Sequence, residues 1–195
     1  MANQDAPFGF RQVGGLGSRP TSEGTSKYTI AASFADSIFA GDIVEAGAGT
    51  SEGGTAIAAG YVGNAAATSS ARNLGIFNGC FYDDPTTSKP TFKNYWPASV
   101  AAEAQAFVYD NPDDLFECQS EGTIVRATVG QGVDMAYTAG ATVNGRSKEE
   151  LATTAGSYAF RVIRISGDPS NSDIGSANAN WIVKFNQHIY YNYST

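Results

Sequence analysis

The chain has 195 residues, of which 19 are acidic and 12 are Lys or Arg, giving a formal net charge of -7. It is long enough to bury a hydrophobic core without metal or disulfide staples. It lacks the basic surface that offsets phosphate charge, so we expect no nucleic-acid partner. No apolar run approaches the roughly 18 residues of a transmembrane helix. The first ten residues lack the basic and apolar regions of a signal peptide, so we expect no membrane association and no secretion.

The first segment, Met1–Ser26, is rich in glycine and has few apolar side chains. Ordering a backbone costs roughly 1 to 2 kcal/mol per residue, which such a segment cannot offset by burying its own apolar surface. The composition therefore predicts an extended N-terminal arm over residues 1–26. Its side chains Phe8, Phe10 and Leu16 are the candidate anchors on a neighbouring subunit.

Short apolar runs of four to nine residues follow the arm, and almost no stretch shows the sustained 3.6-residue period of a helix. This pattern predicts an all-β fold. Turn-forming residues such as Gly41-Asp42 and Asn144-Gly145 separate them. About eight or nine such strands predict a single β-sandwich or barrel over residues 27–188. The expected strands are Tyr28–Ala32, Ile43–Glu45, Ile57–Val62, Leu74–Tyr82, Ala106–Tyr109, Leu115–Gln119, Thr123–Val129, Tyr158–Ile165 and Trp181–His188.

One short helix is expected within this β-domain. Ser147 is followed three residues later by Glu150 and then by Leu151, which is the pattern of a capping box. Val100–Gln105 is a second candidate, rich in alanine but too short to stand alone.

The last strand shows the clearest alternation between its two faces. Trp181, Val183 and Phe185 share one face, which we expect to be packed, and Lys184, Asn186 and His188 share the other, which we expect to be wet. A tail over residues 189–195 follows, with three tyrosines at Tyr190, Tyr191 and Tyr193. Tyrosine is enriched at protein interfaces. The tail is therefore either an interface element or an accidental accumulation of tyrosines.

Residues that could carry catalysis are few. His188 is the only histidine, so any Ser-His-Asp or Cys-His site must use it, and a His-rich metal site is excluded. Asp110, Asp113, Asp114 and Glu117 gather within eight residues around a turn. This acidic cluster is a solvated turn, a cation site or, least in keeping with its spacing, a glycosidase pair. We expect a solvated turn, no enzyme activity, no metal and no cofactor.

The two cysteines, Cys80 and Cys118, both lie in apolar runs. Without a secretion signal they are expected to be buried, reduced thiols rather than a disulfide.

Three strings carry a family resemblance: Phe77–Tyr82, Ala106–Glu117 and Trp181–His188. They resemble virion structural proteins of tailed bacteriophages, of the kind that decorate or cement the head shell. Phe8-Gly9-Phe10, Gly41–Val44 and Arg161–Ile165 fit the same order. The resemblance runs with gaps from Phe8 to His188 and does not extend to Ala46–Ser70 or to the tail.

The resemblance implies a capsid decoration protein without catalytic residues. It implies binding to the lattice of the major capsid protein on the outer surface of the virion, often as a trimer. In that setting we expect the two ends of the chain to hold the subunit on the shell, through Phe8, Phe10 and Leu16 at one end and Tyr190, Tyr191 and Tyr193 at the other.

The alternative is a carbohydrate- or receptor-binding β-module of a phage tail or fibre. Such a module would use Trp96, Tyr95 or Trp181 as a stacking platform.

Overall fold

The computed structural model describes residues 3–17, 24–47, 49–51, 53–65, 72–153 and 158–191. Within these ranges it confirms the all-β prediction: antiparallel sheets pack together as in a β-sandwich, and the only helical element is the 3₁₀ turn Arg126–Thr128. The strands run from β1 to β15, more than the eight or nine expected. No helix in these ranges is long and apolar enough to cross a membrane.

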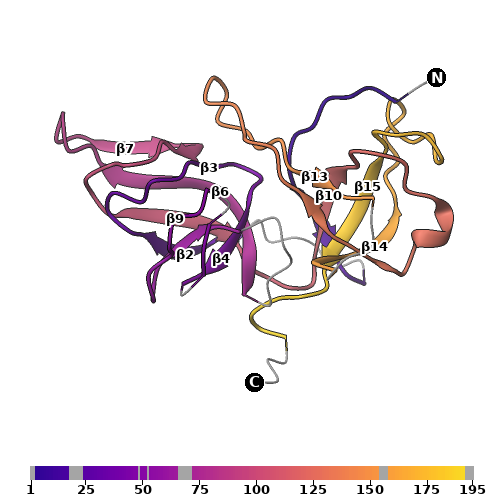
Figure 1. Cartoon of the computed structure of the whole chain (residues 1–195), viewed down its shortest axis with the longest axis horizontal. Helices are drawn as coiled ribbons and strands as arrows, with labels where there is room; N and C mark the ends of the chain where they lie inside the picture. Colours follow the sequence, from indigo (N-terminus) through magenta and orange to yellow (C-terminus); the bar gives the residue numbers. More distant parts are fainter. Residues whose placement is uncertain are drawn as a thin grey trace.

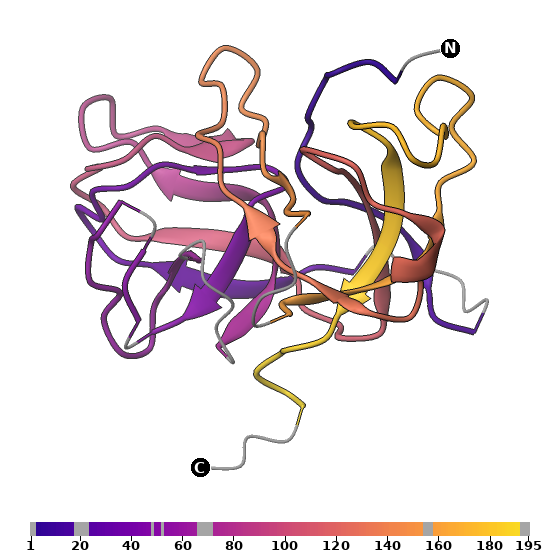
Figure 2. The same ribbon diagram turned by 45° about the vertical axis from the view of Figure 1, so that its right-hand side comes forward.

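The sheets form two lobes, which stand side by side in Figure 1 and again in Figure 2. The first lobe contains one sheet in the order β2-β9-β6-β4-β5, with β7 paired to β6, and the short pair β3-β8. The eleven-residue β6 is its central strand. The strand bounds are β2 Ser26–Ile30, β3 Ile38–Phe39, β4 Ile43–Ala46, β5 Val62–Asn64, β6 Asn73–Asp83, β7 Pro90–Lys93, β8 Tyr95–Trp96 and β9 Ala104–Tyr109.

The second lobe contains a sheet in the order β1-β10-β15-β14-β11 and the short pair β12-β13. Its central strand, β15, buries Trp181, Val183 and Phe185 completely, as the sequence alternation predicts. The strand bounds are β1 Arg11–Gly15, β10 Asp114–Gln119, β11 Gly132–Val133, β12 Met135–Ala136, β13 Glu150–Leu151, β14 Phe160–Ile165 and β15 Asn180–Phe185.

The two lobes share hydrophobic packing along the seam between them. Ile43 and Ile76, on strands of the first lobe, belong to the core cluster of the second. In the opposite direction, Ile189 follows the last strand of the second lobe and packs against the core of the first. The backbone of Gly9 lies so close to Ser147 that a Cβ atom added at Gly9 would be 2.4 Å from the Cβ of Ser147. The lobes are therefore parts of one folded body rather than independent units.

The N-terminal segment is not a separate arm over its described residues 3–17. β1 pairs with β10 and forms one edge of the sheet of the second lobe. The chain before β1 is also held, because Gln119 bonds to the backbone of Gln4 and Ala6. The prediction of an extended arm is wrong here because pairing with β10, polar side-chain bonds and the burial of Phe10 together order the segment.

Neither expected helix forms over the residues that the structure describes. Ser147 accepts a hydrogen bond from the amide of Glu149 at 3.1 Å, which is a local turn, and the chain then enters β13 at Glu150. The second candidate, Val100–Gln105, ends inside β9, which begins at Ala104. The expected strand Thr123–Val129 contains the 3₁₀ turn instead. The two helical preferences are weak, and the pairing of β13 with β12 and of β9 with β2 and β6 overrides them.

Candidate binding surface

The sequence predicted that His188 lies on a solvent-exposed face, and this prediction is wrong. It is buried, and its ring contacts those of Phe185, Tyr190 and Tyr191. Its Nδ1 accepts the amide hydrogen of Tyr190 at 3.2 Å, and burial lowers the pKa of the imidazole. The alternation fails because β15 ends at Phe185, so the strand period no longer sets the direction of a side chain three residues later. This environment is that of a core side chain.

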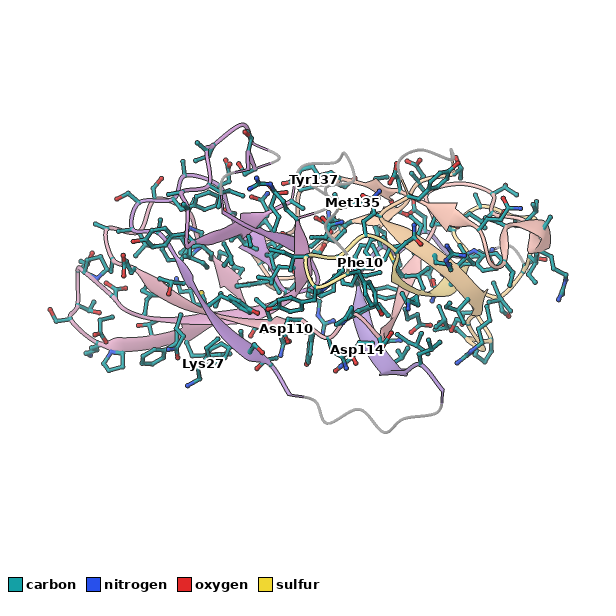
Figure 3. The ribbon with its side chains drawn as sticks, turned by 90° about the horizontal axis from the view of Figure 1, so that it is seen from below. Phe10, Lys27, Asp110, Asp114, Met135 and Tyr137 are labelled. Atoms are coloured by element: carbon teal, nitrogen blue, oxygen red, sulfur yellow. The ribbon has the colours of Figure 1, made fainter. Side chains whose placement is uncertain are left out.

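The predicted acidic cluster is divided among separate partners along the seam, with Asp110 after β9 and Asp114 beside β1 (Figure 3). Tyr28 donates to Asp110 at 2.7 Å, whereas Lys184 and Tyr191 both donate to Asp113. The other two acids are buried. Asp114 accepts from Gln12 and Asn111, and Glu117 accepts from Arg11 and Ser166.

The solvated-turn prediction is therefore wrong for Asp114 and Glu117, which join strands instead. Among the described residues there is no group of three or more His, Cys, Asp or Glu side chains that could hold a metal ion.

Both cysteines are free and buried, as predicted. Cys80 lies in the core of the first lobe and Cys118 in that of the second. Burial raises the pKa of the Cys80 thiol to about 12. Burial, and then the nearby carboxylates of Glu149, Glu150 and Glu117, raise the pKa of Cys118 well above its ordinary value. Both thiols are therefore poor nucleophiles in the folded chain.

We expect a water-soluble aromatic disulfide reagent at pH 8 to modify neither cysteine in the native chain and both in 6 M guanidinium. Exclusion from solvent and a raised thiol pKa both suppress attack in the folded state. Absorbance of the released thiolate counts the reactive groups. Rapid modification of one equivalent in the native chain would contradict the burial of at least one of the two thiols.

The predicted anchor residues are distributed between the core and the surface. Phe10 is only 3% exposed and stacks on Phe160 with ring centroids 4.4 Å apart, so it cannot reach a neighbouring subunit. Phe8 is half-buried beneath the guanidinium of Arg11. Leu16, Tyr190 and Tyr191 are exposed. Tyr193 lies outside the described residues.

The two described tail tyrosines also make bonds within the chain. The hydroxyl groups of Tyr190 and Tyr28 lie 2.7 Å apart, and Tyr28 belongs to the first lobe. Tyr191 bonds to Asp113 and lies 5.2 Å below the ammonium group of Lys184, which is on β15 of the second lobe. The start of the tail therefore connects the two lobes, a role that the sequence did not suggest.

Neither tryptophan offers a stacking platform for a sugar. Trp96 is fully buried and donates its indole N–H to the carbonyl of Phe34 at 3.1 Å, and Trp181 is fully buried in the second lobe. Tyr95 is half-buried and stacks on Phe39. The aromatic residues proposed for the carbohydrate-binding alternative are thus occupied by internal packing.

A different set of aromatic side chains lies on the solvent side of the first-lobe sheet. Phe81 on β6 is 40% exposed and Phe92 on β7 is 59% exposed, and the two are direct cross-strand partners. The rings of Phe92 and the half-buried Phe107 on β9 have centroids 5.9 Å apart. We call Phe81, Phe92 and Phe107 the aromatic face. Lys27 on β2 is the register partner of Phe107 and continues this side of the sheet (Figure 3).

A bulge in β6 allows the phenylalanines to meet. The pairing of β6 with β9 shifts between Phe77 and Cys80, and Gly79 within this bulge has a φ of +129°. A Cβ at Gly79 would lie 3.1 Å from Cζ of Phe92, so the ring of Phe92 covers the glycine. Glycine at this position both permits the backbone angle and leaves room for the ring to lean toward Phe107.

The sequence contained a partial signal for this surface. Within β9, Gln105 and Phe107 alternate with the buried Ala104, Ala106 and Val108, which places them on the outer side. In β6, however, Phe81 is part of a nearly continuous apolar run, so its direction follows only from the bulge and from its pairing partners.

Comparison of the chain with protein-family models, curated proteins and solved structures finds no match in any of the three.

Proposed function

We propose that the chain is a non-enzymatic decoration protein of a bacteriophage head, and that it attaches to the outer surface of the major capsid protein lattice through the aromatic face. The observation that carries the proposal is the pair of exposed phenylalanines, Phe81 at 40% and Phe92 at 59%, which lie beside the half-buried Phe107 on neighbouring strands. Clustered exposed apolar side chains mark interaction sites, and aromatic side chains commonly dominate the energy of an interface.

The strings that resemble phage head proteins include parts of this surface. Phe77–Tyr82 contains the bulge and Phe81, and Ala106–Glu117 begins with the strand that carries Phe107. The resemblance and the exposed surface therefore concern the same two strands. The polar residues first considered for catalysis serve internal bonds: His188 is core, and Asp113 and Glu117 each join two segments of the chain.

Stabilisation of a shell needs no chemistry. A protein that binds assembled subunits more tightly than separated ones stabilises the assembly by mass action. A homotrimer on the shell would repeat one set of contacts three times around a closed ring. We take the trimer as the attached form, with Leu16, Tyr190 and Tyr191 as exposed side chains available for secondary contacts.

The test is cosedimentation of the purified chain with undecorated head shells. We expect Phe92→Ser combined with Phe107→Ser to weaken attachment at least tenfold, because interface aromatics commonly cost about 2 kcal/mol or more when truncated. The matched control is Val143→Ser, which changes a side chain that is 99% exposed and lies outside the aromatic face.

A thermal melt of each variant verifies folding, and Phe92→Ser alone serves if the double variant is unstable. Attachment of folded variants at the same limiting concentration as the parent would contradict the aromatic face as the attachment surface.

A further inference from the structure

A cavity of about 440 Å³ opens at the seam between the lobes. β1 of the second lobe borders it on one side, and Gly41 and residues of β6 and β9 border it on the other. In Figure 3, Phe10 lies between the two lobes. The amide of Phe10 donates to the carbonyl of Gly41 at 3.0 Å, which fixes β1 against the first lobe at one end of the cavity. The volume is within the range of roughly 300 to 1,000 Å³ typical of ligand pockets.

The charged side chains that line the cavity are both arginines, Arg11 and Arg146, and no described Asp or Glu lines it. This is unexpected in a chain with 19 acidic and 12 basic residues. Arg11 is paired with Glu117. The exposed guanidinium of Arg146 has no hydrogen-bond or ion-pair partner within the described part of the chain. The amides of Gln12, Asn78 and Asn94 complete the polar lining, so the cavity favours an anionic ligand with hydrogen-bonding groups.

The backbone of Arg146 is held in place by hydrogen bonds to the first lobe. Ala40 and Arg146 form a parallel β-bridge, in which the amide of Ala40 donates to Gly145 and that of Ser147 donates to Ala40, both at 3.0 Å. These bonds attach the segment around Arg146 to the first lobe, so the backbone that carries this side chain is fixed at the cavity before any ligand arrives. A fixed backbone at the binding site reduces the entropic cost of binding.

The third feature is the free edge of β1. Phe10, Arg11, Gln12 and Val13 all line the cavity, although alternate residues of a strand point to opposite faces. An edge strand that borders the cavity accounts for lining by consecutive residues, and the register shift between Gln12 and Gly14 also changes the direction of the Val13 side chain. β1 is the last strand on its side of the sheet, so within the described residues this edge has no strand partner. Unpaired edges bind extended polypeptide segments through main-chain hydrogen bonds.

We propose that this cavity binds a short acidic segment of another protein in extended conformation, which adds to the free edge of β1 and places a carboxylate against Arg146. The bulge at Val13, where the pairing of β1 with β10 shifts, limits the regular edge and therefore favours a short segment. This site is separate from the aromatic face and does not depend on the proposed attachment to a shell.

The probe is the peptide acetyl-Val-Glu-Val-Glu-Val-amide, titrated into the full ¹⁵N-labelled chain. Acetyl-Val-Gln-Val-Gln-Val-amide, in which both glutamates are replaced by glutamine, is the uncharged control peptide. We expect the glutamate peptide to shift the backbone amides of Arg11–Val13 and the side-chain amides of Asn78 and Asn94. The glutamine peptide should bind roughly ten- to hundredfold more weakly, because a charge-assisted hydrogen bond is lost.

Arg146→Gln should reduce the affinity for the glutamate peptide to that for the glutamine peptide. Lys148→Gln is the matched control, since Lys148 is an exposed cation two residues away that does not line the cavity. The proposal is overturned if the shifts occur elsewhere, if the two peptides bind equally, or if Arg146→Gln binds like the parent. Shifts of the same amides with protein concentration alone would identify a second copy as the occupant and overturn the assignment to another protein.

Discussion

Replacing Phe10 with alanine is expected to lower the free energy of unfolding by about 3 to 5 kcal/mol, the usual cost of removing a buried phenylalanine side chain. Phe10 is 3% exposed and stacks on Phe160, which in turn packs on Phe185 with centroids 4.8 Å apart. The ring therefore fills the core of the second lobe, and its loss leaves a cavity at the point where β1 begins.

Urea denaturation of the full chain, followed by tryptophan fluorescence, measures the effect. Trp181 belongs to the same core cluster as Phe10, so its emission reports on this region. Leu16→Ala is the matched control: Leu16 follows β1 but is exposed, and its loss should change the free energy of unfolding by about 0.5 kcal/mol or less. Equal stability of the two variants would restore the interpretation of the N-terminal segment as an arm outside the core.

The strands that could be predicted are those with a strong apolar signal of their own. The alternation around Trp181 identifies β15 and the side chains that it buries, and the apolar run Leu74–Tyr82 lies within β6. In both cases hydrophobic burial decides the structure, and burial of this kind is encoded locally by the order of apolar and polar residues.

The elements that could not be predicted are held by partners distant in sequence. β1 has the sequence Arg-Gln-Val-Gly-Gly, which resembles a flexible linker. It becomes a strand because β10 offers an edge and because Asp114 and Glu117 bind its polar side chains. A scan of composition cannot detect such bonds, since each requires residues about a hundred positions apart to meet.

The candidate surface was missed for a related reason. Sequence reasoning placed the binding residues at the two ends of the chain because they appeared to lack a packing role, yet Phe10, Tyr190 and Tyr191 all have internal partners. Phe81 and Phe92 instead lie in the middle of the chain. They become one surface only after β6 pairs with β7, and the register of that pairing cannot be determined from either strand alone.

The stability of the chain is expected to fall as the pH rises from about 4 to about 7, because of Asp42. This side chain is fully buried, and burial raises its pKa to about 7 against the pull of hydrogen bonds from the Phe39 amide and from Ser147. The unfolded chain has the ordinary value of 3.8. Between these values the folded chain holds a proton that the unfolded chain has released, so each increase in pH favours unfolding.

The stabilisation is fully present below about pH 3.8 and is lost once the pH exceeds about 7. At about 1.4 kcal/mol for each pH unit between the two pKa values, the free energy of unfolding should fall by about 4 kcal/mol from this group. Glu150 acts in the same direction, because burial and the charges of Asp5 and Glu121 raise its pKa to about 7. Its contribution is smaller because it is partly exposed and solvent screens its interactions.

Asp42→Asn tests this assignment, because an amide carries no proton to release. Urea denaturation at half-unit steps from pH 4.5 to pH 8.5 should show a steep decline for the parent and a much flatter curve for the variant, with the largest gain in relative stability above pH 7. Asp84→Asn is the matched control: Asp84 is only partly buried, and hydrogen bonds from the amides of Thr86 and Thr87 lower its pKa, so it titrates below this range and the parent slope should persist. A parent whose stability is constant or rises over this interval, or an Asp42→Asn chain that declines as steeply as the parent, would show that the buried Asp42 carboxyl does not set the pH dependence.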